Sequence, residues 1–72
     1  MRPMRYAVVI EPGDQGYGAY VPDLPGCVAV GATKSEVERR IREAIVFHLE
    51  GLRAEGLPIP EPKHRVEYVE AG

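Results

Sequence analysis

Residues 4–11 alternate between apolar and polar or small positions with the two-residue period of a β-strand. Tyr6, Val8 and Ile10 occupy one side of this alternation, and aromatic and β-branched residues favour strands. The Pro-Gly-Asp-Gln-Gly segment that follows contains the residue types that tight turns require. Residues 16–21 then alternate in the same way. The pattern therefore predicts two antiparallel strands joined by a tight turn.

The Pro-Asp-Leu-Pro-Gly segment at residues 22–26 is expected to end the second strand, because its two prolines have no amide to donate to a ladder. Pro25 followed by Gly26 fits the two central positions of a type II turn, so we expect the chain to reverse here. Residues 27–31 read Cys-Val-Ala-Val-Gly, a short apolar run between glycines. This run predicts a third strand.

A helix is predicted to begin after Thr33, which forms a capping-box signature with Glu36. The Thr33 hydroxyl can accept from the Glu36 amide while the Glu36 carboxylate reaches back to the Thr33 amide. Gly56 is suited to end the helix, and the proline-rich residues 57–62 favour an extended connector. The helical period places one apolar stripe on the helix, made of Val37, Ile41, Ala44, Ile45, His48 and Leu52.

Residues 65–70 alternate once more, with Val66 and Tyr68 on one side, and predict a fourth strand at the edge of the sheet. The predicted fold class is therefore α+β: an antiparallel three-stranded meander packed by one amphipathic helix, followed by a C-terminal edge strand. We expect residues 1–72 to form a single domain, since a chain of this length buries one core. The first strand is apolar on both sides while one helix is available, so we expect another chain to cover the second face.

Composition and charge restrict the partner. The formal net charge of −2 and the isoelectric point near 5.6 argue against nucleic acid as a direct partner and favour a basic protein. No apolar run approaches the roughly 20 residues that span a bilayer, and no signal-peptide pattern is present, so we expect no membrane contact and a cytoplasmic location. Cys27 is the single cysteine, which fits a reducing compartment. The lack of asparagine and the seven prolines are typical of heat-adapted proteins.

The residues that could carry chemistry are few. His48 and His64 are separated by the proline-rich connector and have no ligands at metal-binding spacing. Cys27 has no neighbouring base that would activate it and is interpreted as a small buried hydrophobe. The arginines at the start of the helix alternate with glutamates, which is typical of a solvated face rather than an RNA site. We therefore predict no enzymatic activity, no metal and no cofactor.

Several ordered segments together resemble the HicB-type antitoxin domain. They are the strand at 6–10, the sequence Gly-Tyr-Gly-Ala-Tyr-Val-Pro-Asp-Leu-Pro-Gly-Cys at 16–27, the Gly-Ala-Thr helix entry at 31–33 and the proline-rich sequence at 56–62. The resemblance implies a partial double-stranded-RNA-binding-like fold that binds a small, basic, RNA-cleaving toxin of the HicA type and occludes its active site. It also implies a homodimer or homotetramer. Longer members add a C-terminal DNA-binding domain, and because this chain ends at Gly72 we expect it to have none of its own.

Two other functions compete with the antitoxin function at this point. The RNA-binding-like fold and the helix arginines favour a nucleic-acid-binding or nuclease protein, which the net charge opposes. A solitary homo-oligomeric domain, whose partner is a copy of itself, is the third. For the antitoxin function we predict partner contacts near the turn after the second strand, because aromatic side chains commonly anchor interfaces. The predicted contact residues are Tyr17, Tyr20, Asp23 and Leu24.

Overall fold

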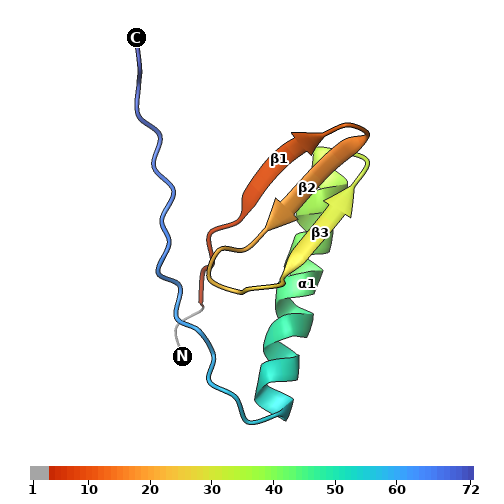
Figure 1. The fold of residues 1–72 in the computed structure, drawn as a ribbon, viewed down its shortest axis with the longest axis vertical. Helices are drawn as coiled ribbons and strands as arrows, with labels where there is room; N and C mark the ends of the chain where they lie inside the picture. The colour runs from red at the N-terminus through yellow and green to blue at the C-terminus, as the bar shows by residue number, and fades with distance from the viewer. Residues whose placement is uncertain (1–3) are drawn as a thin grey trace.

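The computed structural model describes residues 4–72, in which three strands precede one helix (Figure 1). The strands are β1 (Val9–Gly13), β2 (Gly16–Tyr20) and β3 (Val28–Gly31). They form one antiparallel sheet in the order β1-β2-β3, which confirms the predicted meander.

The first strand begins later than predicted. Val9, its first residue, pairs with Tyr20, the last residue of β2. Residues 4–8 have no strand opposite them, because beyond Tyr20 the chain turns away at Pro22. Residues 4–8 have the alternating pattern of a strand, but a strand also needs a neighbouring strand to pair with, and the pattern does not show where that neighbour ends.

The turn between β2 and β3 is built as its sequence predicts. The Cys27 amide donates to the Leu24 carbonyl at 3.0 Å, and Gly26 has a φ of +84°, as the third residue of a type II turn requires. The Val21 amide donates to the Cys27 carbonyl at 3.2 Å and closes the base of the loop. This geometry directs the Leu24 side chain into the core, where its exposed fraction is 0%.

Helix α1 (Lys34–Ala54) has a cap at each end. The Glu36 amide donates to the Thr33 hydroxyl at 3.1 Å, as predicted. The Glu36 carboxylate, however, accepts from the Ala32 amide at 2.9 Å and not from the Thr33 amide, so the predicted reciprocal bond is shifted by one residue. At the other end Gly56 has a φ of +69°, and the Gly56 and Leu57 amides donate to carbonyls of the last turn, which is the Schellman arrangement.

One core lies between the sheet and α1. Val37 and Ile41 of the predicted stripe are buried, and Ala44 and Ile45 pack against them. Cys27 is buried as predicted, at 4% exposure. The buried residues of this core are Ala19, Val21, Leu24, Cys27, Val37 and Ile41.

The predicted fourth strand is the main correction to the fold. Residues 65–70 are extended and exposed but form no strand with any other part of residues 4–72. Figure 1 shows this segment leading away from the sheet beside β1. The radius of gyration of 13.6 Å exceeds the value of about 11 Å expected for a chain of this length, because the segment stands apart.

Candidate partner-binding surface

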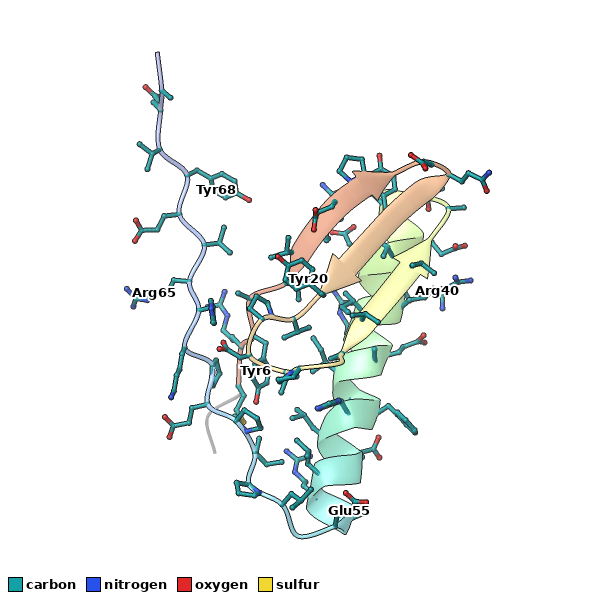
Figure 2. The ribbon with its side chains drawn as sticks, viewed as in Figure 1. Tyr6, Tyr20, Arg40, Glu55, Arg65 and Tyr68 are labelled. Atoms are coloured by element: carbon teal, nitrogen blue, oxygen red, sulfur yellow. The ribbon has the colours of Figure 1, made fainter. Side chains whose placement is uncertain are left out.

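The face of the sheet opposite α1 is uncovered and apolar. Strand register places Val9, Tyr20 and Val28 in one row across the three strands, and Glu11, Gly18 and Val30 in the next. The exposed fractions are 42% for Tyr20, 63% for Val28 and 69% for Val30. Figure 2 shows Tyr20 on this side of the sheet. We call this surface, made of Val9, Glu11, Gly18, Tyr20, Val28 and Val30, the outer face.

Gly18 leaves a hollow in the middle of the outer face. A groove of about 340 Å³ lies over it, with walls that include Glu11, Tyr20, Val28 and Val30. A Cβ built on Gly18 would meet no atom within 4 Å, so the space above it is open to solvent. An apolar side chain of a partner can therefore enter the groove and contact three valine or tyrosine side chains at once.

Asp23, in the loop between β2 and β3, binds the C-terminal segment. Its Oδ2 accepts from the Lys63 amide at 2.8 Å and from the His64 amide at 2.9 Å, and its Oδ1 lies 2.6 Å from His64 Nδ1. The Asp23 side chain is only 7% exposed. The His64 amide, more than any other group, holds the pKa of the Asp23 carboxyl below its ordinary value of 3.8.

Tyr6 provides a second attachment for the same segment. Its hydroxyl donates to the Pro60 carbonyl, and Figure 2 shows its ring between the sheet and the C-terminal segment. Burial raises the pKa of Tyr6, and the negative charge of Asp23 adds to this effect. Residues 60–64 are thus fixed to the body of the molecule, and residues 65–72 extend beyond the last attachment point.

The structure distributes the four predicted contact residues over different environments. Tyr20 lies on the outer face, and Tyr17 packs on the opposite side, against the core. Leu24 has no exposed surface with which to contact a partner in this conformation. Asp23 is occupied by Lys63 and His64.

Sequence reasoning missed Val28 and Val30. The run Cys-Val-Ala-Val is apolar throughout, so its period does not reveal which side chains face the helix. The signal that could have found them was the expectation of a sheet apolar on both faces, combined with the alternation of one strand. Their contact with a partner is a proposal made below.

Two of the helix arginines, Arg39 and Arg40, are paired with carboxylates. Arg39 lies 3.5 Å from Glu43, and Arg40 lies 3.6 Å from Glu36. The Ala32 amide, followed by the charge of Arg40, lowers the pKa of Glu36. This part of the helix is therefore a charge-balanced surface, as its sequence pattern predicted.

A search of residues 4–72 finds no group of three or more His, Cys, Asp or Glu side chains that could hold a metal ion. Within the same residues, no helix is both long enough and apolar enough to cross a membrane. Burial raises the pKa of the Cys27 thiol, which disfavours the reactive thiolate.

Comparison with known proteins gives a consistent result. The family model described as the HicB_like antitoxin of bacterial toxin-antitoxin system matches residues 6–71. An uncharacterized 14.9 kDa protein from the rep-hol intergenic region of Haemophilus phage HP1 is 38% identical over 66 residues, which cover 92% of this chain and 50% of that protein. This chain therefore spans half the length of the phage relative. A UPF0150 protein of Helicobacter pylori is 43% identical over 58 residues, which cover 81% of each chain.

A solved structure is similar in fold as well as in sequence. One chain of the HicA3 and HicB3 toxin-antitoxin complex aligns with a TM-score of 0.71 and 35% identity, covering 82% of this chain and 70% of that chain. The three-stranded meander with one helix across a single face defines a small α+β protein whose outer face is free. By its match over residues 6–71, this chain belongs to the HicB-like antitoxin family of bacterial toxin-antitoxin systems.

Proposed function

We propose that this chain is an antitoxin-type binding domain that binds a small RNA-cleaving HicA-type toxin through its outer face and covers the toxin's active site. In this role the chain binds its partner and carries out no catalytic step. The observation that carries it is the uncovered apolar outer face with its hollow at Gly18. Family membership, and the presence of a 35% identical chain in a HicA3 and HicB3 complex, support the choice of partner.

The size and charge of the surface agree with such a partner. A stable protein interface buries about 1,200–2,000 Å² in total, or about 600–1,000 Å² on each side. This chain has 6046 Å² of accessible surface, so an interface of that size requires much of one face rather than a single loop. A toxin that binds RNA carries positive charge, and the net charge of −2 on this chain favours the encounter.

Filling the hollow is the sharpest test. In Gly18→Val the new side chain occupies the groove, its Cβ meets no atom of its own chain within 4 Å, and a β-branched residue suits a strand. We expect the variant to fold and to bind a HicA-type toxin at least tenfold more weakly than the natural chain does, a loss of about 1.4 kcal/mol. Growth rescue on co-expression and the dissociation constant of the purified pair measure this effect.

Gly51→Ala is the matched control. It adds a side chain at another glycine with open space around it, on α1 and away from the outer face. It should bind the toxin as the natural chain does. If a folded Gly18→Val chain also binds normally, the outer face is not the contact surface. If the natural chain neither binds nor neutralises a HicA-type toxin encoded beside it, the proposed function itself is wrong.

Direct nucleic-acid binding is the competing function and finds less support. Arg39 and Arg40 are both engaged with glutamates, which lowers the positive charge that this part of the helix offers to a nucleic acid. An RNA and DNA gel shift across salt concentrations separates the two functions. Tight binding that weakens steeply as salt rises would favour nucleic acid as the partner.

A further inference from the structure

The part of the chain that forms the sheet carries charge of one sign. Residues 6–33 contain three acidic residues, Glu11, Asp14 and Asp23, and no lysine, arginine or histidine. The basic residues of the chain lie before the sheet, on α1 and in the C-terminal segment. Asp23 already accepts hydrogen bonds from that segment, so Glu11 is the charged residue that the sheet offers on its outer face.

Glu11 stands beside the hollow at Gly18. Strand register pairs Glu11 with Gly18 and places Val30 on the other side of Gly18. Of the described residues that line the groove of about 340 Å³, Glu11 alone is charged, and Tyr20 is the aromatic one. Among residues 4–72, no basic side chain forms an ion pair with Glu11. The groove therefore combines apolar walls with one carboxylate that can accept a partner.

A molecule that covers the groove removes water from the Glu11 carboxylate. A carboxylate that is buried without a partner is strongly unfavourable. Arg40 of the same chain reaches only the edge of β3, where it donates to the Val30 carbonyl, and it does not line the groove. The covering surface must therefore bring a cation or hydrogen-bond donors to this point, and an apolar side chain alone does not meet this need.

A long basic side chain suits every wall of the groove. Its methylene stem is apolar and can lie over Gly18, against Val28 and Val30, while its charged end reaches the carboxylate. The face of an aromatic ring attracts a cation, and Tyr20 supplies such a ring on the same surface (Figure 2). A toxin that binds RNA presents lysine and arginine side chains, because the phosphates of RNA are anionic.

We propose that the groove over Gly18 receives one lysine or arginine side chain of the toxin, which pairs with Glu11 and lies against the ring of Tyr20. This inference rests on the proposed function and names the chemistry of its central contact. The net charge of −2 acts at long range on the rate of encounter. The Glu11 pair is desolvated in the complex, so it acts on the rate of dissociation.

Removing one charge without changing side-chain size tests the pair. We expect Glu11→Gln to bind a HicA-type toxin at least about tenfold more weakly, with faster dissociation, because the cation is left buried without its partner. Glu50→Gln is the matched control, since it removes the same charge at an exposed position of α1. It should change the dissociation constant by less than about twofold. Thermal unfolding of both variants, followed by circular dichroism, checks that each is folded at the assay temperature.

Two substitutions separate the ring of Tyr20 from its apolar area. Tyr20→Phe retains the aromatic face and should bind the toxin nearly as tightly as the natural chain does. Tyr20→Leu retains an apolar side chain without that face and should bind at least about threefold more weakly than Tyr20→Phe. Equal affinities of these two variants would overturn the contact between Tyr20 and a cation.

A double-mutant cycle identifies the partner side chain. Each lysine and arginine of the toxin is replaced in turn by methionine, which keeps an apolar stem, and is assayed with the natural chain and with Glu11→Gln. At one position we expect a loss of at least about tenfold with the natural chain and less than about threefold with Glu11→Gln.

Three results would overturn this inference and leave the proposed function intact. They are natural affinity in Glu11→Gln, equal weakening by Glu50→Gln, and a cycle that shows coupling at no position of the toxin. A natural chain that binds no HicA-type toxin encoded beside it would overturn both.

Discussion

Replacing Gly31 by alanine tests how closely α1 is seated on the sheet. A Cβ on Gly31 would lie 2.7 Å from the Val37 amide nitrogen, 3.1 Å from its Cα and 3.2 Å from the Glu36 carbonyl carbon. All three atoms belong to the backbone of the first helical turn, so the helix must move to make room. Overpacking of this kind costs about 1–3 kcal/mol.

Gly18→Ala is the matched comparison, because Gly18 lies in the adjacent strand with nothing within 4 Å of a built Cβ. Both substitutions restrict the unfolded chain and gain about 0.4–1 kcal/mol in this way. The difference between the two variants therefore isolates the packing cost. A difference of 2 kcal/mol separates their melting temperatures by about 8–16 °C in a chain of this size.

Urea unfolding followed by circular dichroism measures both variants, at equal chain concentrations so that any self-association affects them equally. We expect Gly31→Ala to unfold at lower urea with an unchanged slope, and Gly18→Ala to unfold at the same or higher urea than the natural chain. Equal midpoints for the two variants would refute the argument that Gly31 is required for close packing.

Three further predictions follow from buried or capping contacts. Leu24→Ala empties a fully buried position and should reduce the free energy of unfolding by about 2–5 kcal/mol, whereas a loss below 1 kcal/mol by urea titration would contradict its core role. Thr33→Ala removes the hydroxyl that accepts from Glu36 and should cost about 0.5–2 kcal/mol, with Thr33→Ser as a near-neutral control. Since the pKa of Asp23 is lowered on folding, its contacts with Lys63 and His64 contribute stability above pH 3.8 and are lost as the pH falls through the lower folded pKa. Amide chemical shifts of those two residues should change together in that range, and a transition that persists in Asp23→Asn would rule out Asp23 as its source.

Local signals in the sequence predicted most of the fold. The glycine and proline turn at 22–26, the cap at Thr33 and the glycine end at Gly56 each act through neighbouring residues, so the sequence contains the whole cause. The predicted strand at 65–70 was wrong within this chain, because pairing needs a distant neighbour that the alternation of side chains does not specify. The sequence places Leu24 within a turn, where an exposed side chain was expected, but the fold buries this side chain completely.

The candidate surface follows from how few elements the chain has. One helix can cover one face of a three-stranded sheet, so the side chains of Tyr20, Val28 and Val30 stay in water unless another molecule covers them. Residues 65–70 are a second uncovered segment, because they pair with neither edge strand of the sheet, β1 or β3. Arg40 donates to the Val30 carbonyl at 3.0 Å and so satisfies one of the backbone groups on the free edge of β3 that no strand pairs with.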